Sequence, residues 1–294
     1  MYKTRIDDCI ILNGDSRDVL SSLKQKVALI VTSPPYADAR KSHYQSIHPD
    51  KFADWLLSFH DVFWEVLKED GSLVLNIKDK IVDGIRHRFV WHTIEGFMKK
   101  GWFCIDDYIW HKTNPMPGKW PNRLRDGWEY CFHLSKTKRP YFNPDNVRKP
   151  IGDWVNTRLR NLNENDLQRH NSENNSGFGR NISKWLGKTT VLPSNVLNLP
   201  LVGKNKGHPA VFPVDLPLFF IKLLSHENDW VLDPFCGSGT TGIAALTVAR
   251  KCILVDSNKE YCEVARKRIL EEVKEIEEDT RQLVLFEKHM RYGK

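Results

Sequence analysis

The 294-residue sequence has no apolar run long enough to span a membrane. Its first eight residues include four charged side chains, which is too polar a start for a secretory signal. We therefore expect a cytoplasmic protein that makes no membrane contact.

Cysteine is sparse, and its spacing excludes two further classes of protein. The six cysteines are scattered and include no C-x-x-C pair, so neither a zinc site nor a disulfide framework is expected. The sequence predicts no metal site, and buried reduced thiols are the expected state.

Acidic residues are scarce in one segment, and this localises the excess of positive charge. Residues 135–206 hold 13 of the 44 lysines and arginines but only 5 of the 37 acidic residues, a net charge of +8, whereas the remainder has a net charge of −1. Thirteen asparagines lie between Asn143 and Asn205. The segment could be a disordered insertion. Its interleaved aromatic and basic residues favour an irregular recognition module that binds a polyanion.

Outside this segment, apolar runs typical of strands alternate with helical spacing, which predicts an α/β fold with a mostly parallel sheet. The expected strands are 27–31, 72–77, 102–110, 128–134, 230–233 and 252–256. The expected helices are 51–68, 86–100, 214–225, 241–249 and 259–277. A loop rich in proline, glycine and asparagine separates the third and fourth strands.

The segment Gly237-Ser238-Gly239-Thr240-Thr241-Gly242 follows an expected strand and opens an expected helix. This G-x-G-x-x-G pattern lets the backbone approach a ligand closely. Asp256 ends the next strand, 19 residues after Gly237, where a carboxylate can hold a ribose diol. Both a nicotinamide dinucleotide and S-adenosyl-L-methionine suit this arrangement, and an ordinary tight turn is the structural alternative.

Two features favour S-adenosyl-L-methionine. A dinucleotide fold needs a second mononucleotide-binding half, and only a helix and a tail are expected after Asp256. Asp233 lies just ahead of the glycines. A carboxylate there suits a cationic methionine group better than an anionic pyrophosphate.

The second motif, Thr32-Ser33-Pro34-Pro35-Tyr36, follows the expected strand 27–31. Ser33 offers a hydroxyl acceptor, Pro34 a carbonyl in a stiff frame, and Tyr36 a ring for stacking. The exocyclic amine of cytosine or adenine needs such acceptors, because its lone pair is delocalised into the ring. Catalysis would then rest on positioning and electrostatics, without a covalent intermediate. A proline-stiffened loop without function is the alternative.

The two motifs together resemble those of the DNA methyltransferases that act on exocyclic amines. Thr32-Ser33-Pro34-Pro35-Tyr36 resembles their catalytic motif, and the segment from Asp233 to Thr241 resembles their S-adenosyl-L-methionine motif. With the catalytic motif first, the chain resembles the permuted β group, which implies a Rossmann-like methyltransferase fold in a prokaryotic protein. Shorter matches lie at Asn13-Gly14-Asp15, at 112–117 and at 207–210.

The resemblance assigns a role to each matching position. Ser33, Pro34, Pro35 and Tyr36 would hold the target base. The positions implied to contact the cofactor are Asp15, Thr32, Asp233, Phe235, Gly237, Ser238, Gly239, Thr240 and Asp256. Residues 1–134 and 207–294 would form the catalytic domain, and 135–206 the target-recognition region.

In this family, serine at the first position of the catalytic motif usually accompanies cytosine N4, which implies N4 methylation of a flipped-out base in duplex DNA. The adenine-N6 reaction is the nearest alternative. Methylation at cytosine C5 is disfavoured, because it needs a Pro-Cys nucleophile and no cysteine here follows a proline. We expect a companion restriction endonuclease or an orphan enzyme.

Six basic residues of the recognition segment are the expected DNA contacts: Arg148, Lys149, Arg158, Arg160, Arg169 and Arg180. Near the end, Gln282-Leu283-Val284-Leu285-Phe286 resembles the peptide by which bacterial proteins bind the sliding clamp. An apolar tail that packs on its own domain is the alternative there. A non-catalytic nucleic-acid-binding module and a dehydrogenase remain as rival functions.

Overall fold

The computed structural model describes residues 2–37, 47–152, 187–202 and 212–292, and the last turns of the C-terminal helix by their backbone alone. The chain divides into two compact units. The first comprises Met1–Asn143 and Asn195–Lys294, and the second Pro144–Ser194. The predicted role of the basic segment in target recognition stays a prediction.

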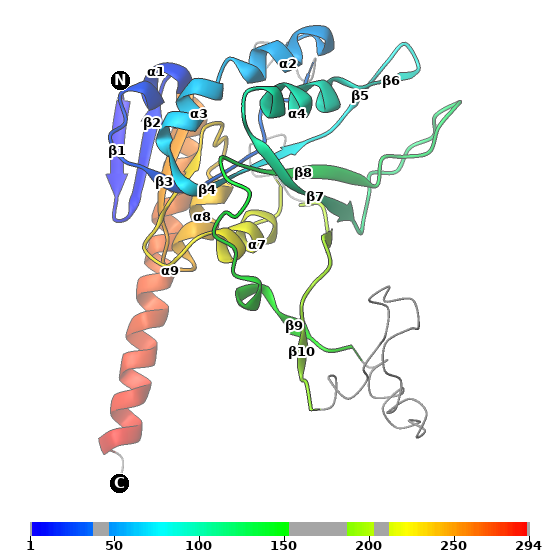
Figure 1. Ribbon diagram of the computed structural model, residues 1–294. Coiled ribbons are helices and arrows are strands. Elements are labelled where there is room, and N and C mark those ends of the chain that lie inside the picture. Colours follow the sequence, from blue (N-terminus) through cyan, green and yellow to red (C-terminus); the bar gives the residue numbers. More distant parts are fainter. Residues whose placement is uncertain (1, 38–46, 153–186, 203–211, 293–294) are drawn as a thin grey trace, which may run out of the picture. The chain divides into compact units, whose positions relative to one another are not determined.

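The first unit is built around a sheet with nine strands among the described residues (Figure 1). In spatial order these are β1 (Tyr2–Ile6), β2 (Cys9–Asn13), β13 (Lys251–Asp256), β12 (Trp230–Asp233), β3 (Val27–Thr32), β4 (Leu67–Ile77), β8 (Trp128–Ser135), β7 (Phe103–Lys112) and β11 (Val196–Leu199).

The five central strands, from β2 through β13, β12 and β3 to β4, pair in parallel, as do β7 and β11. Strands β1 and β8 run antiparallel to their neighbours. The predicted α/β fold with a mostly parallel sheet is confirmed. The chain order reverses between β12 and β3, and in open parallel sheets ligands bind beyond the carboxyl ends of the strands at such a point.

Helices lie in two groups. One group is α1 (Ser16–Ser21), α2 (Pro49–Leu57), α3 (His60–Val66) and α4 (Phe89–Lys99). The other is α7 (Asp215–Leu224), α8 (Thr240–Leu246) and α9 (Lys259–Tyr292). In the first group α2 contacts α4 and α1 contacts α3, and in the second α8 contacts both α7 and α9.

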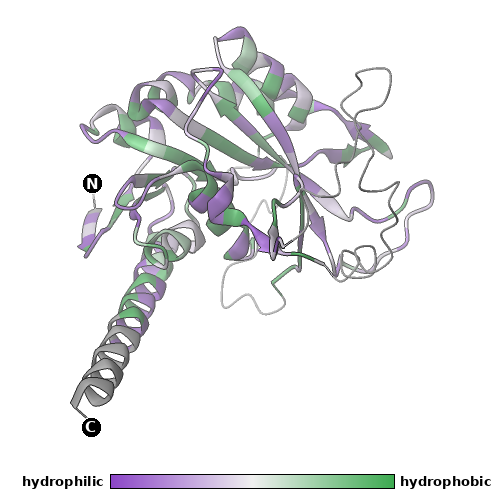
Figure 2. Cartoon of the chain, turned by 60° about the horizontal axis from the view of Figure 1, so that its bottom comes forward, coloured by the Kyte–Doolittle hydropathy of each residue, from purple (hydrophilic) through white to green (hydrophobic). Residues whose placement is uncertain are grey.

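The largest fully buried side chains belong mostly to the first group and the strands beneath it, including Phe52, Phe63, Phe89, Phe97 and Phe132. Each such burial contributes about 2–3 kcal/mol. The middle strands are coloured mainly as hydrophobic in Figure 2, as expected for strands that are covered on both faces.

The predicted helix 51–68 is two helices, α2 and α3, separated at Ser58, and residues 67–68 already belong to β4. The Ser58 hydroxyl donates to the carbonyl of Trp55 at 2.6 Å. A serine hydroxyl that bonds back to the preceding turn competes with the helical backbone, which accounts for the break.

The predicted helix 86–100 begins later, because Arg86 and His87 belong to the second strand of a hairpin. Strands β5 (Lys80–Val82) and β6 (Ile85–His87) pair antiparallel. Asp83 and Gly84 between them have φ values of +49° and +79°. An Asp-Gly pair with positive φ is typical of a two-residue hairpin turn, so α4 starts only at Phe89.

The second unit contains the 3-10 turn η1 (Pro144–Val147) and the short antiparallel pair β9 (Lys149–Pro150) and β10 (Thr190–Val191). The predicted DNA contacts at Arg158, Arg160, Arg169 and Arg180 lie outside the described residues, as does the family match at 207–210.

Helix α9 continues to Tyr292, well beyond the predicted end near residue 277. The segment Gln282–Phe286 therefore lies within this helix, and its side chains lie outside the described part of the chain. Binding of this segment to a sliding clamp stays a prediction. No described helix is both long and apolar enough to cross a membrane.

Candidate active site

Four segments meet at the carboxyl edge of the sheet: 13–16 after β2, 32–37 after β3, 233–241 after β12 and 256–258 after β13. Segment 13–16 is joined by hydrogen bonds to segments 233–241 and 256–258. The amide of Asn13 donates to the carbonyl of Asp256 at 2.9 Å, and the Ser16 hydroxyl donates to the carbonyl of Pro234 at 2.5 Å. Residues separated by more than two hundred positions therefore form one edge.

Asp233 is at the centre of this edge and is almost fully buried. Its carboxylate accepts hydrogen bonds from the Thr32 hydroxyl at 2.6 Å, from the Thr241 hydroxyl at 2.6 Å and from the backbone N–H of Phe235 at 3.1 Å. Burial raises the pKa of Asp233 to about 6, against the opposing effect of these donors. We call residues 233–242 the glycine loop. The hydrogen bond from Thr32 to Asp233 joins the Ser-Pro-Pro-Tyr loop directly to it.

Asp256 accepts hydrogen bonds from two backbone N–H groups, that of Gly237 at 2.9 Å and that of Asn258 at 2.8 Å. Its burial raises its pKa, while these two bonds favour the charged form. A carboxylate offers about four acceptor positions, so Asp256 keeps capacity for a further donor such as a hydroxyl group.

The glycines of the loop have two different structural roles. Gly237 and Gly239 have φ values of +49° and +80°, which side chains other than glycine rarely adopt. A Cβ on Gly239 would lie 2.9 Å from Cβ of Ala265 in α9, and one on Gly242 would lie 2.8 Å from Cδ1 of Leu254. Gly239 and Gly242 therefore allow α8 to pack closely against α9 and β13.

Other predicted cofactor residues have protein partners. Ser238 is buried, and its carbonyl and hydroxyl both accept from Arg268 at 2.7 Å. Thr240 is buried as well. Asp15 is the N-cap of α1 and pairs with Arg17 at 2.6 Å, whose hydrogen bond lowers the pKa of Asp15.

Phe235 packs against the aromatic rings of Trp55 and Phe59, which lie far from it in the sequence. Its centroid lies 5.6 Å from that of Trp55 and 5.1 Å from that of Phe59. Aromatic pairs at these separations stabilise a fold beyond their buried area. Phe235 therefore packs the start of the glycine loop against α2, through Trp55, and against Phe59, which follows that helix.

In the Ser-Pro-Pro-Tyr loop, Pro34 is buried and Ser33 is half-buried. The only hydrogen bond of the Ser33 side chain within the described residues is a long one, 3.4 Å to the hydroxyl of Tyr36. The Tyr36 hydroxyl itself donates to Oε2 of Glu129 at 2.6 Å. Burial, followed by the nearby Glu129, raises the pKa of Tyr36, so that the phenol stays protonated.

Glu129 anchors a buried polar cluster that the sequence did not predict. Its Oε1 accepts from Nζ of Lys112 at 2.5 Å, and its Oε2 also lies 3.3 Å from the amide of Asn76. All three residues are buried. A buried charge persists only when it is paired and hydrogen-bonded, so the cluster holds the Tyr36 hydroxyl in a fixed place. The available signal was a single acidic residue within the apolar strand 128–134.

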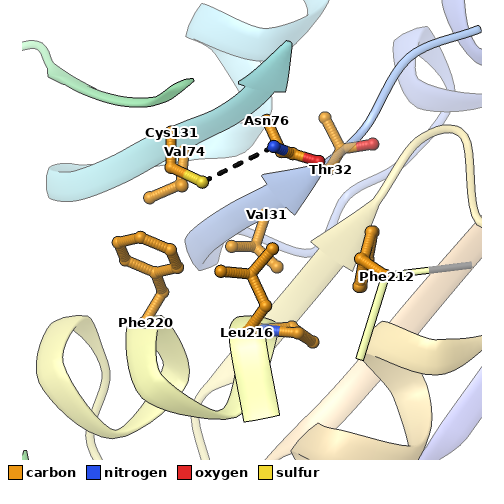
Figure 3. Close-up of a pocket in the computed structure, with 9 residues that line it drawn as sticks. Val31, Thr32, Val74, Asn76, Cys131, Phe212, Leu216 and Phe220 are labelled. Atoms are coloured by element: carbon orange, nitrogen blue, oxygen red, sulfur yellow. Dashed lines mark hydrogen bonds between the residues drawn. The ribbon is translucent and has the colours of Figure 1, made fainter. Parts of the chain in front are cut away.

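A small cavity lies beside this cluster, between α7 and the sheet (Figure 3). Its volume is about 10 Å³, and Thr32, Asn76 and Leu216 are among its lining residues. Ligand pockets usually measure about 300–1,000 Å³, so this cavity is far too small for a cofactor and has room for about one water molecule. Oδ1 of Asn76 is a buried acceptor without a hydrogen-bond partner in the part of the chain that the structure describes.

These features fit S-adenosyl-L-methionine. The acceptor set consists of two buried carboxylates and the unpaired Asn76 oxygen at one edge. Acceptors of this kind suit an ammonium group and a ribose diol. No cluster of metal-ligating side chains is present among the described residues.

The two described DNA-contact candidates, Arg148 and Lys149, are exposed in the second unit. Arg148 pairs with Asp145 at 2.7 Å. Their role in DNA binding stays a prediction.

Known proteins resemble the chain over most of its length. The model of the N6/N4 methyltransferase family, whose description is DNA methylase, matches residues 27–267. The type II methyltransferase M.PvuII of Proteus hauseri is 31% identical over 282 residues, which cover 88% of this chain and 82% of that protein.

Two solved structures extend the likeness to the fold. The PvuII DNA methyltransferase (cytosine-N4-specific) matches with a TM-score of 0.66 at 26% identity, over 88% of this chain and 85% of that one. TTHA0409 of Thermus thermophilus, solved with S-adenosyl-L-methionine, matches with a TM-score of 0.58 at 25% identity, over 90% and 93% of the two chains.

The predicted methyltransferase fold and the predicted cofactor, S-adenosyl-L-methionine, are confirmed by these matches. The dehydrogenase and the non-catalytic module are excluded as interpretations of the two motifs. The chain belongs to the N6/N4 DNA methylase family and is an S-adenosyl-L-methionine-dependent DNA methyltransferase.

Proposed function

We propose that this enzyme methylates the N4 amine of a cytosine that is flipped out of duplex DNA, and that it belongs to the permuted β group. The observation that carries this proposal is the position of Ser33. It follows Thr32, whose hydroxyl donates to Asp233 of the glycine loop, and its own hydroxyl has only a 3.4 Å contact with the residues that the structure describes. A weakly engaged acceptor thus stands one residue from the cofactor loop.

Ser33 and the carbonyl of Pro34 would accept the two hydrogens of the target amine. These contacts would turn the nitrogen lone pair out of conjugation and toward the methyl donor. Pro34 and Pro35 stiffen the backbone that holds the acceptors, since both rings fix φ. Little reorganisation is then needed at the moment of transfer.

Tyr36 would stack on the extruded base. Its hydroxyl is held by Glu129 at 2.6 Å, and Glu129 is held by Lys112 and Asn76. The ring would therefore meet the base in a fixed orientation. Glu129 acts through Tyr36 and is a positioning residue.

On the cofactor side, Asp233 and Phe235 with Gly237, Gly239 and Thr240 would line the methionine end, and Asp256 would hold the ribose. The bound cofactor supplies an electrophilic methyl group. Asp15, paired with Arg17 at the start of α1, would lie near the adenine. Thr32 and Ser238 would contribute through the bonds that shape the loops.

The choice of cytosine N4 over adenine N6 rests on serine at position 33 and on the likeness to a protein described as cytosine-N4-specific. The likeness to type II methyltransferases also supports a role beside a companion restriction endonuclease. The basic segment 135–206 would contact the DNA.

Product analysis tests the base identity. The enzyme is incubated with mixed-sequence duplex DNA and S-adenosyl-L-methionine, and the digested nucleosides are analysed by mass spectrometry. We expect N4-methylcytosine, and we expect Ser33→Ala to form it about 100-fold more slowly while cofactor affinity stays unchanged. N6-methyladenine as the product would reject the proposed base and retain the family.

A further inference from the structure

Two loops at the carboxyl edge form a surface that the proposed mechanism does not use. The β5–β6 hairpin follows β4, and loop 113–127 follows β7. Strands β4 and β7 both run antiparallel to β8, so they point in the same direction and end at the edge that carries Ser33. Figure 1 shows both loops on the same side of the sheet. We call residues 78–88 and 113–127 the loop pair.

The loop pair is a built structure. The Asn122 amide donates to the carbonyl of Gly84 at 3.0 Å, and Asp126 pairs with Arg86 at 2.7 Å and with Lys78 at 3.7 Å. Within loop 113–127 the Arg123 guanidinium lies over the Trp120 ring at 4.5 Å. The two loops therefore hold one another in place.

The loop pair is basic. It contains seven lysines and arginines and three aspartates. Lys119 and Arg125 are exposed and have no acidic partner within the described residues. Cations placed in this way attract phosphates.

The tips of the loop pair are apolar, which is unusual beside so much charge. Leu124 is 89% exposed, Ile85 73% and Met116 71%. These three are the most exposed large hydrophobic side chains among the described residues. Leu124 stands between Arg123 and Arg125, and Ile85 follows the Gly84 that Asn122 contacts.

We propose that the loop pair is a second DNA-binding surface, in which Lys119 and Arg125 contact phosphates while Leu124 and Ile85 enter the base stack. Apolar wedges of this kind unstack neighbouring bases in several DNA-binding proteins. A base that leaves the helix costs a few kcal/mol of stacking and pairing. A side chain that takes its place would offset part of that cost. This inference rests on the proposed flipping of the target base.

The phosphate contacts are tested by binding to a fluorescein-labelled mixed-sequence duplex at several salt concentrations. For Lys119→Ala with Arg125→Ala we expect about tenfold weaker binding and a salt slope reduced by about two. The matched control is Lys24→Ala with Lys99→Ala, two exposed lysines that precede β3 and β7 at the opposite edge. Equal binding by the loop-pair variant and the wild type would overturn the phosphate contacts.

The wedge is tested by single-turnover methylation of a short duplex that carries the site mapped from the wild-type product. For Leu124→Ala with Ile85→Ala we expect a rate about tenfold lower on paired DNA and nearly normal on DNA whose target base is mispaired, because a mispaired base is easier to extrude. Met98→Ala, at a 49% exposed side chain of α4, is the control.

Equal rates on both duplexes for the wedge variant and the wild type would reject the wedge. So would loss of self-association in sedimentation with unchanged DNA behaviour, since the apolar tips would then bind protein. Transfer to adenine N6 by the wild type would reject the proposed base and leave both tests valid. Absence of transfer would reject the proposed function, and the salt slope would still test the loop pair.

Discussion

The glycine loop and the Ser-Pro-Pro-Tyr loop lie on adjacent strands and are held in opposite ways. In the glycine loop, Asp233, Ser238, Thr240 and Thr241 are buried, and each has hydrogen-bond partners within the protein. In the Ser-Pro-Pro-Tyr loop, Ser33 is half-buried, and its side chain makes a single, long hydrogen bond to the described part of the chain. The glycine loop is held by hydrogen bonds. The Ser-Pro-Pro-Tyr loop is stiffened by its prolines, and its acceptor atoms stay available to the substrate.

This difference separates the two tasks of the site. A cofactor pocket that is assembled before binding costs little ordering when the ligand arrives. Acceptors that develop their full strength only on the reacting amine favour the transition state over the ground state. Variants in the two loops should therefore fail in different ways.

The largest effect is expected for Asp233→Ala. This change leaves the hydroxyls of Thr32 and Thr241 and the N–H of Phe235 without their acceptor in a buried place. Each unmatched group costs about 1–3 kcal/mol. The protein should therefore be less stable. The carboxylate that suits the cationic methionine group is lost as well, so we expect cofactor affinity to fall at least about 100-fold by calorimetry. Affinity within threefold of the wild type would contradict the role of Asp233.

Glu129→Gln is expected to reduce kcat about 10- to 100-fold with little change in the KM for the cofactor, because Tyr36 loses its charged anchor. Stability should also fall, by about 3 kcal/mol, since Lys112 keeps a buried charge without a partner. The double variant Glu129→Gln with Lys112→Met separates these effects. Stability should return in it, and kcat should not. Recovery of kcat along with stability would reduce Glu129 to a structural residue.

Gly239→Ala is expected to destabilise the fold by about 2 kcal/mol, or about 30-fold in the folding constant. Its Cβ would lie 2.9 Å from Cβ of Ala265, and its φ is +80°. Urea denaturation measures the change. Gly127→Ala is the control, because a Cβ there meets nothing within 4 Å. Unchanged stability in Gly239→Ala would show that α8 and α9 pack more loosely than described.

The smallest effect concerns pH. The pKa of Asp233 is about 6 because of burial, so the charged form that a cationic ligand needs is lost as pH falls through that value. We expect the cofactor affinity of the wild type to drop about tenfold for each further pH unit, and that of Asp233→Asn to stay level. Calorimetry at about pH 5 and about pH 8 measures the cofactor affinity of each protein. Parallel pH dependence in the two proteins would contradict this prediction.

Protein stability should move in the opposite direction. The native state binds the Asp233 proton more tightly than the unfolded chain, because its pKa is raised from 3.8 to about 6. The cost of burying the charged form is therefore present above about pH 6 and is relieved as pH falls toward about 4. The stability difference between wild type and Asp233→Asn, measured across this range, tests the sign.

The sequence predicted those parts of the fold that depend on local pattern. The strands β3, β12 and β13 are short apolar runs that end in Thr32, Asp233 and Asp256, and they lie where expected. The amino-terminal strands β1 and β2 were not predicted, since their five-residue segments carry a mixed pattern. The β5–β6 hairpin was not predicted, and its residues Arg86 and His87 were assigned to the following helix, although Asp83-Gly84 is a turn signal.

The sequence predicted the site residues that lie within its motifs. It did not predict the contacts between residues that are distant in the chain. Thr32 and Asp233 were both named, but the hydrogen bond that joins them depends on β3 and β12 being neighbours. Glu129, Lys112 and Asn76 come from three strands. Such a cluster becomes visible only when the strand register is known.

The most direct test of the division between the loops compares Ser33→Ala with Asp233→Ala in two assays, cofactor affinity by calorimetry and single-turnover methylation of duplex DNA. We expect Ser33→Ala to bind the cofactor as the wild type does and to methylate about 100-fold more slowly. Asp233→Ala should lose affinity, and its rate should recover in part at high cofactor concentration. Loss of cofactor affinity in Ser33→Ala, or a normal rate, would contradict the account.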